Sequence, residues 1–132
     1  MKEPVWIDER DARALHERML ALHGGAPGIR DAGLLQSALA RAQQQFAYME
    51  GADVIDMAAA YTSGIVHNHP FIDGNKRTGF VVGILFLELN GHRFTASEEA
   101  AAQAVLEMAA GRLDDASYSA FLRAHSTPQT ET

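Results

Sequence analysis

The feature that most restricts the fold is a nearly unbroken apolar run from Gly79 to Leu87. It follows the polar stretch HNHPFIDGNKRTG, residues 67–79, and is closed by Asn90-Gly91. Because Asn-Gly commonly ends a helix, the run predicts a helix from about Asn75 to Leu89. A helix that is apolar nearly all round belongs in the middle of a bundle, and this run is too short to span a bilayer.

Further helices are predicted where apolar residues recur at helical spacing behind a capping residue. In the first of them the expected inward stripe is Ala12, Leu15, Met19 and Leu22. The expected caps are Asp8, Asp31, Asp53 and Asp114, together with a capping box formed by Thr95 and Glu98. The sequence therefore predicts an all-α fold, a bundle of about six helices.

Three short segments interrupt this helical pattern. The stretch FAYMEG, residues 46–51, is partly aromatic and closed by glycine, which favours a small hairpin or flap. The apolar segments VWI (5–7) and HRF (92–94) are expected to pair as a minor ribbon. The final STPQTET is polar and expected to fray, so the domain is assigned to residues 1–126 and a polar tail to 127–132.

Composition excludes several classes of protein. A chain of 132 residues suits one domain, and the absence of cysteine rules out disulfides and thiolate metal sites. The formal net charge of −6 argues against direct nucleic-acid binding, so any anion must be held by a local site. With no apolar signal segment at the N-terminus, a cytoplasmic protein without membrane association is expected.

The loop that precedes the apolar helix has the features of an anion site. The first amides of a helix lack intrahelical partners, and the helix dipole favours negative charge there. Gly74 allows close approach of a ligand, while Lys76 and Arg77 place two cations in the first turn, where they oppose the dipole. A bound phosphate would reverse that unfavourable arrangement.

Two more loop residues extend this prediction. Asp73 could hold Mg²⁺ beside phosphate oxygens, or could simply cap the helix. His69 could take a proton from an attacking hydroxyl, or could be an ordinary loop histidine. A zinc site formed with His67 is a weaker alternative, because the neighbouring basic pair would repel the cation. A Walker loop is excluded, since Phe80 stands where its lysine is required.

The segment HPFIDGNKRTG, residues 69–79, resembles the signature of the Fic superfamily, and is most similar to its death-on-curing (Doc) branch. The upstream stretch GGAPGIRDAGLLQSALARAQQQFAY and the downstream FLELNG resemble Doc-type toxins as well. The resemblance covers roughly residues 10–95. Two features depart from Doc: His67-Asn68 precede the motif, and Pro70 and Gly74 are closer to the general Fic pattern.

The resemblance implies a Fic fold with the motif between two central helices, and an enzyme that uses ATP and Mg²⁺. It also implies a role for each matching position. These are His69 as general base, Asp73 as Mg²⁺ ligand, Gly74, Asn75, Lys76 and Arg77 as binders of the nucleotide phosphates, Phe71 as anchor of the loop, and Tyr48 and Met49 within a flap at 46–52 that aligns the target peptide.

Two positions favour phosphoryl transfer over AMP transfer. Lys76 stands where AMP-transferring members have a third glycine, and Phe80 where many have a second arginine. The resemblance then implies a toxin of a type II toxin–antitoxin system, a protein kinase acting on elongation factor Tu to arrest translation. Fic-type AMP transfer to a protein hydroxyl and an inactive Fic-fold binding module are the alternatives.

Inhibition is expected to come from another chain. Some members of the superfamily carry an inhibitory motif of the form (S/T)xxxE(G/N). Thr95 and Glu99 have that spacing here, but Ala100 occupies the last position. The resemblance therefore implies a separate, Phd-like antitoxin as partner.

Overall fold

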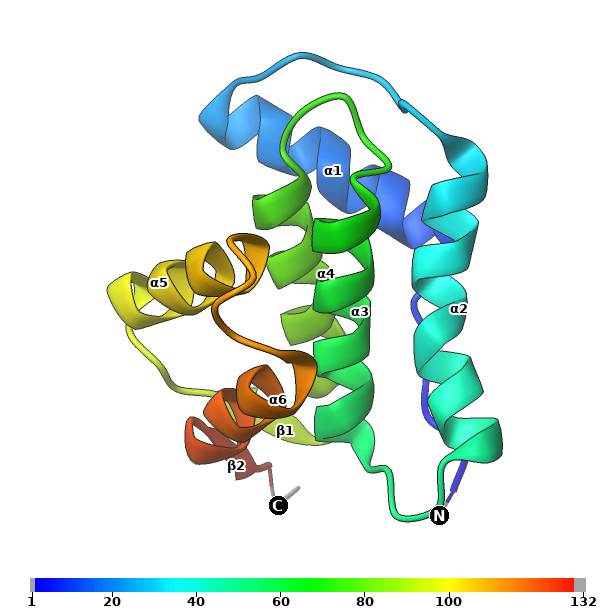
Figure 1. The fold of residues 1–132 in the computed structure, drawn as a ribbon, viewed down its shortest axis with the longest axis vertical. Coiled ribbons are helices and arrows are strands. Elements are labelled where there is room, and N and C mark those ends of the chain that lie inside the picture. The colour runs from blue at the N-terminus through cyan, green and yellow to red at the C-terminus, as the bar shows by residue number, and fades with distance from the viewer. Residues whose placement is uncertain (1, 130–132) are drawn as a thin grey trace.

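A computed structural model describes residues 2–129 of the chain. Within them lie six helices and two short strands, which confirms the all-α prediction (Figure 1). The elements in chain order are α1 (Glu9–His23), α2 (Ala32–Tyr48), α3 (Val54–Asn68), α4 (Asn75–Leu89), β1 (His92–Phe94), α5 (Glu98–Ala109), α6 (Asp115–Ala124) and β2 (Ser126–Pro128).

The helices begin where the aspartate caps predicted them. Asp8, Asp31, Asp53 and Asp114 each accept a hydrogen bond from the backbone amide three residues later. Asp8 and Asp53 also form reciprocal capping boxes with the residue at that third position. Such caps satisfy amide groups that have no intrahelical partner, and each is worth about 1 kcal/mol.

The two central helices are α3 and α4, which run antiparallel through the bundle (Figure 1). Eleven of the fifteen residues of α3 are buried, so α3 is more enclosed than α4. Small residues allow the close approach of the helices. A Cβ atom at Gly64 would lie 2.9 Å from the Ala38 carbonyl of α2, and one at Gly83 would lie 2.9 Å from the Ala58 carbonyl of α3.

The outer helices cover this pair from several sides. Figure 1 shows α2 along one side of α3, with α5 and α6 on the other and α1 across the end where α3 meets α4. On α1, Ala12 and Met19 face the core as predicted, but Leu22 is 62% exposed. The side chain that replaces it in the buried stripe is His16.

The predicted hairpin at 46–51 is wrong, because α2 continues as far as Tyr48. The reason is tertiary: Phe46 packs edge-on against Trp6 with ring centroids 5.7 Å apart, which holds the last turn of the helix in place. The chain turns only afterwards, at Gly51, whose φ of +83° suits glycine.

The predicted cap of the fifth helix is also wrong. Ser97, and not Thr95, caps α5, and its hydroxyl accepts a hydrogen bond from the Ala100 amide at 3.1 Å. Thr95 instead directs both its amide and its hydroxyl to the carbonyl of His125, at 2.7 and 2.9 Å. Competition from this distant carbonyl could not be read from local spacing.

The minor ribbon forms with a different partner. Strand β1 pairs antiparallel with β2, with Phe94 opposite Ser126, so part of the stretch expected to fray is ordered. Residues 5–7 bind side chains instead: the Val5 amide donates to Asn90 Oδ1 at 2.8 Å and the Ile7 amide to the Tyr61 hydroxyl at 3.0 Å. Residues 130–132 of the predicted tail lie outside the described part of the chain.

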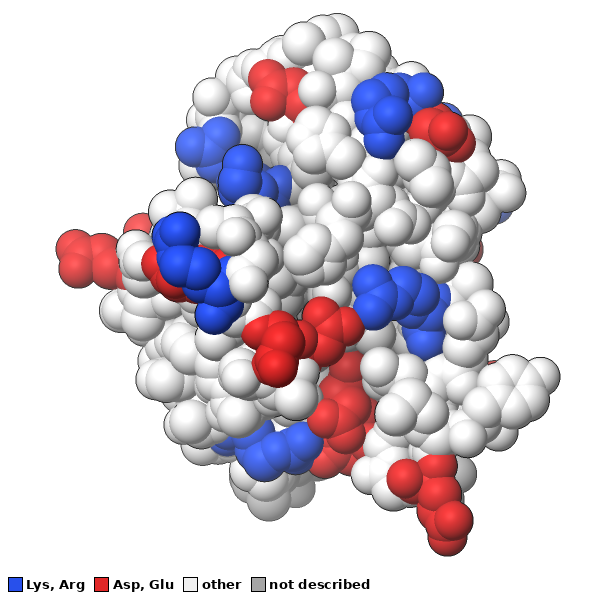
Figure 2. Space-filling model, in the orientation of Figure 1, with Lys and Arg blue, Asp and Glu red and all other residues white. Residues whose placement is uncertain are grey.

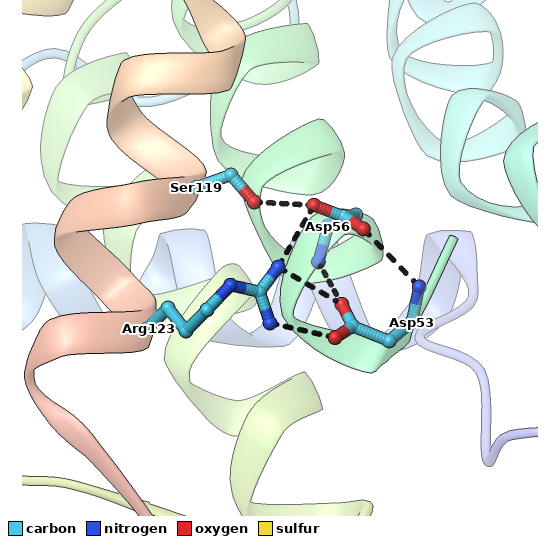
Figure 3. A network of polar contacts seen from close by, with 4 residues as sticks. All are labelled: Asp53, Asp56, Ser119 and Arg123. Carbon is cyan, nitrogen blue, oxygen red and sulfur yellow. Dashed lines mark hydrogen bonds and ion pairs between the residues drawn. The ribbon is translucent and has the colours of Figure 1, made fainter. Parts of the chain in front are cut away.

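A polar seam joins α3 to α6 on the side away from α2. It consists of Asp53, Asp56, Ser119 and Arg123 (Figure 3). Arg123 forms ion pairs with Asp53 at 2.6 Å and with Asp56 at 3.2 Å, and the Ser119 hydroxyl donates to Asp56 at 2.6 Å.

No helix between residues 2 and 129 has the length and apolar character needed to cross a membrane.

Candidate active site

The loop at residues 69–74 joins α3 to α4 at one end of the bundle (Figure 1). The segment between α1 and α2 runs beside it and fixes its backbone. The Pro70 carbonyl accepts hydrogen bonds from the amides of Arg30 and Asp31 at 2.7 and 3.0 Å, and the Ile72 amide donates to the Gly28 carbonyl at 3.1 Å. The loop is therefore held like one strand of a very short antiparallel pair.

Phe71 and Asn75 hold the loop from within. Phe71 is fully buried, and Asn75 is only 4% exposed. The Asn75 side chain binds the Phe71 backbone twice, accepting from its amide and donating to its carbonyl, both at 2.9 Å. These bonds use Oδ1 and one of the two N–H groups of Nδ2, so the Asn75 side chain holds the loop backbone at the start of α4.

His69 ends α3 and presents an exposed imidazole. It has φ +52° and ψ +53°, and among residues 2–129 it is the single non-glycine residue with positive φ. Such a conformation is uncommon and is held by the surrounding structure. Arg30 supplies the restraint, because its Nε donates to the His69 carbonyl at 2.7 Å and its Nη2 to the Asn68 carbonyl at 2.9 Å.

Arg30 was missed by the sequence analysis. It lies 39 residues from His69 and occupies a breaker-rich loop. The terminal carbonyls of a helix lack intrahelical partners and favour a cation, so the end of α3 is a natural place for a guanidinium. A basic residue directly before the cap Asp31 was the available signal.

Asp73 is exposed and ionised. Its Oδ2 accepts from the Ala26 amide at 3.2 Å and its Oδ1 from the Gly74 amide at 2.9 Å. These two bonds, the first more than the second, hold the pKa of Asp73 below its ordinary value, and the charge of Arg77 adds to them. Asp73 is not the cap of α4, since that position belongs to Gly74.

His16 is a second residue that the sequence analysis missed. It is 4% exposed, and its Nε2 lies 2.8 Å from the carbonyl oxygen of Asp73. Its ring stacks on Phe71, with centroids 3.8 Å apart and planes within 9° of parallel. Its place on the apolar stripe of α1, between Ala12 and Met19, was a signal of burial but not of a contact with the loop.

The start of α4 carries unpaired positive charge. Lys76 and Arg77 are exposed in its first turn, and neither forms an ion pair with a carboxylate in the described residues. Gly74 has φ +79°, and no side chain between residues 2 and 129 caps the helix. Figure 2 shows basic and acidic side chains interspersed in small groups on the face in view, without one large basic surface there.

The structure does not bring Tyr48 and Met49 to this loop. Asp31 at the start of α2 contacts the loop, whereas Tyr48 is the last residue of that helix. A helix of 17 residues rises about 25 Å, so the two ends of α2 are far apart. Tyr48 and Met49 are 85% and 59% exposed at the opposite end of the bundle. The backbone that lies beside the loop belongs to residues 26–31 instead.

The zinc alternative is not supported either. Within the described residues there is no group of three or more histidine, cysteine, aspartate or glutamate side chains placed to hold a metal ion. Asp73 and His69 occupy opposite ends of the loop, and His67 is exposed on the last turn of α3. One carboxylate with phosphate oxygens and water remains a sufficient set for Mg²⁺, which rarely uses an all-protein site.

Comparison with known proteins finds relatives over most of the chain. The model of the Fic/DOC family matches residues 6–87, which include the loop, His16 and Arg30. The chain is 35% identical over 95 residues to the protein kinase doc of Escherichia phage P1, a match that covers 72% of this chain and 75% of that protein. It is 40% identical over 77 residues to the toxin Doc of Mycolicibacterium smegmatis, covering 55% of this chain and 57% of the relative. The chain belongs to the Fic/DOC family.

Proposed function

We propose that this protein is a Doc-type toxin that transfers the γ-phosphoryl group of ATP to a hydroxyl of another protein. One observation carries the proposal: an exposed histidine and an ionised aspartate lie on one rigid loop that leads into an uncapped, positively charged helix start. The relatives named protein kinase doc and toxin Doc agree with this function.

The residues present fit a magnesium nucleotide. Lys76, Arg77 and the free amides of the first turn of α4 would bind its phosphates. The Gly74 amide already donates to the Asp73 carboxylate. Gly74 would therefore contribute by opening the turn and by orienting that carboxylate. Asp73 would hold Mg²⁺, whose charge offsets that of the phosphate oxygens during transfer.

His69 would act as general base. Its imidazole accepts the proton of the target hydroxyl as the hydroxyl oxygen forms a bond to the γ-phosphorus. The bond from that phosphorus to the β–γ bridging oxygen breaks, and ADP leaves with the electron pair. Since Arg30 fixes the carbonyl of His69, the imidazole starts from a defined backbone position.

The target peptide would align on residues 28–30, in place of Tyr48 and Met49. The amide of Arg30 and the carbonyl of Gly28 pair with the loop, so the amide and carbonyl of Ile29 point to the other side. An extended peptide could bind there by adding a strand. The proposed target is elongation factor Tu, with arrest of translation as the result.

Phe80 supports phosphoryl transfer over AMP transfer. It takes the place where many AMP-transferring members have an arginine, and it packs against Phe94 with ring centroids 5.8 Å apart. It therefore adds no charge to the phosphate site.

The proposal also includes a separate Phd-like antitoxin that restrains the enzyme, and a cytoplasmic location together with its target.

The test uses purified protein, Mg²⁺, elongation factor Tu, and ATP labelled separately on its α- and γ-phosphates. The expected result is label from the γ position on the factor, lost in His69→Ala and retained in His67→Ala, a matched exposed histidine two residues away. Label from the α position would replace the proposal with AMP transfer. If neither nucleotide labels the factor or any protein in a cell extract, the remaining alternative is an inactive Fic-fold binding module.

A further inference from the structure

We propose that His16 is a positioning residue for the end of the active-site loop that carries Asp73. Through one hydrogen bond to the Asp73 carbonyl it sets the orientation of the carboxylate. The expected effect of His16 on Mg²⁺ binding rests on the proposed function. Its expected effect on the order of the loop rests only on the contacts of the folded chain.

The hydrogen bond has a fixed direction. A carbonyl oxygen can only accept, so the Nε2 of His16, 2.8 Å from it, must carry the proton. The histidine comes from α1, 57 residues before Asp73 in the chain. At 4% exposure the ring is shielded from water, so no solvent molecule can readily replace this donor.

The geometry of the peptide unit carries the effect to the carboxylate. The Asp73 carbonyl and the Gly74 amide belong to the same planar group and point in opposite directions. His16 binds the carbonyl, while the Gly74 amide donates to Asp73 Oδ1 at 2.9 Å. A rotation of this peptide would break both bonds together. The His16 contact therefore restrains the carboxylate without touching it.

Packing holds the imidazole against the loop. Its ring lies flat on Phe71, and a Cβ atom added to Gly74 would meet its Nε2 at 3.8 Å. Leu20 closes the same space, 3.6 Å from that added atom. The ring can therefore contribute in two ways, as a hydrogen-bond donor or as a flat apolar filler, and these predict opposite results for two substitutions.

His16→Phe keeps a flat ring and removes the donor. His16→Gln removes the ring and keeps an N–H group at a similar reach from the backbone. If the donor matters, the phenylalanine variant is impaired and the glutamine variant is close to wild type. If His16 only fills space, the order is reversed and the effect appears in thermal stability alone.

Two measurements on the full chain separate these outcomes. The first is hydrogen exchange of the Gly74 amide by NMR, without nucleotide. The second is calorimetric titration with ADP, with and without Mg²⁺. In His16→Phe we expect faster exchange at Gly74 and a Mg²⁺-dependent affinity about tenfold weaker, as is common when a group that orients a metal ligand is removed. His16→Gln should restore both values.

His125→Phe is the matched control. His125 Nδ1 lies 2.9 Å from the Phe121 carbonyl and its ring packs on Phe121, with centroids 4.7 Å apart, at the other end of the bundle. This variant should leave both readouts unchanged. If His16→Phe does not fold, His16→Leu takes its place as the variant without a donor.

Unchanged Gly74 exchange in His16→Phe would overturn the proposal, and so would equal losses in the phenylalanine and glutamine variants. Failure of the proposed function gives a different pattern, because the wild type would then show no Mg²⁺-dependent binding of ADP. In that case the exchange rates alone decide whether His16 positions the loop, by the same criterion.

Discussion

Two helix starts in this molecule, those of α3 and α4, are built from the same residue types in opposite ways. At α3, Asp53 caps the helix, and Arg123 pairs with both Asp53 and Asp56 (Figure 3). At α4, Asp73 lies one residue too early to cap, and Arg77 has no carboxylate partner among residues 2–129. One start satisfies its own charges, whereas the other leaves amides and cations free.

The difference separates a stabilising site from a binding site. A capped helix start with an ion pair contributes to folding and has little capacity left for a ligand. An uncapped start with basic side chains has unfavourable electrostatics until an anion arrives. The side chains of Asp73 and Asn75 do not cap α4; they accept hydrogen bonds from backbone amides of the loop and of Gly74 instead. The expected effects of substitutions therefore divide between activity at α4 and stability at α3.

The largest expected effect is on activity at the loop. His69→Ala should lower the rate of phosphoryl transfer by about 10²- to 10⁴-fold, the usual contribution of a general base. The imidazole is exposed and only the backbone of His69 is held, so the melting temperature should stay close to that of the wild type. Initial rates with γ-labelled ATP and a thermal melt test both parts. A variant that keeps full activity would remove His69 from the mechanism.

Lys76→Ala should have the next largest effect. Losing one charged contact to a phosphate should weaken nucleotide binding by about tenfold, with the fold unchanged. Calorimetric titration with ATP analogues gives the affinity. Arg93→Ala, which removes an exposed cation from β1, is the control. Equal affinities for the Lys76 variant and the wild type would remove Lys76 from the phosphate site and leave only Arg77 and the amides of α4 as candidates.

Local patterns predicted the fold well where the information was local. Each aspartate cap lies within three residues of the amide it binds, so Asp8, Asp31, Asp53 and Asp114 could be recognised from spacing. Thr95 was predicted as the cap of α5 in place of Ser97, because the carbonyl that binds Thr95 belongs to His125, 30 residues away. The extension of α2 to Tyr48 likewise depends on a distant contact between Phe46 and Trp6.

The candidate site shows the same limit. The sequence motif placed His69, Asp73, Lys76 and Arg77 on one loop and helix start, because they are neighbours in the chain. Its supports could not be found in that way, since Arg30 and His16 reach the loop from 39 and 57 residues away. Tyr48 and Met49 were assigned to a flap that aligns the target peptide without knowledge of the direction of α2, which carries them to the opposite end.

The comparison predicts that Asp53→Ala affects stability and not activity. Loss of the cap should lower the free energy of unfolding by about 1 kcal/mol, with a further loss because Arg123 keeps only Asp56 as partner. Asp114→Ala removes a cap at α6 for which residues 2–129 provide no arginine partner, so the difference between the variants measures the ion pair. Urea unfolding gives both values. A lower transfer rate in either variant would show that the two regions are coupled.

The smallest expected effect is the pH dependence of stability at the loop. Amide bonds from Ala26 and Gly74 lower the pKa of Asp73, so the ionised carboxylate stabilises the folded state at every pH above its ordinary value of 3.8. That contribution is lost as the pH falls through the lowered pKa of the folded state. The difference in unfolding free energy between wild type and Asp73→Asn should therefore be constant from pH 7 to about pH 5 and should shrink below about pH 4.

The same titration at the seam sharpens the contrast between the two helix starts. Burial alone would raise the pKa of Asp53, but the bonds from Arg123 and from the Asp56 amide outweigh it, so this pKa is lowered as well. Protonation of Asp53 also weakens its ion pair with Arg123, whereas Asp73 forms no ion pair within the described part of the chain. Asp53→Asn should therefore show a larger change than Asp73→Asn in urea unfolding between pH 5 and pH 3, and one that is smaller in high salt. An equal change in both variants would mean that Asp73 is bound as firmly into the fold as Asp53, which would weaken the assignment of Asp73 to a ligand.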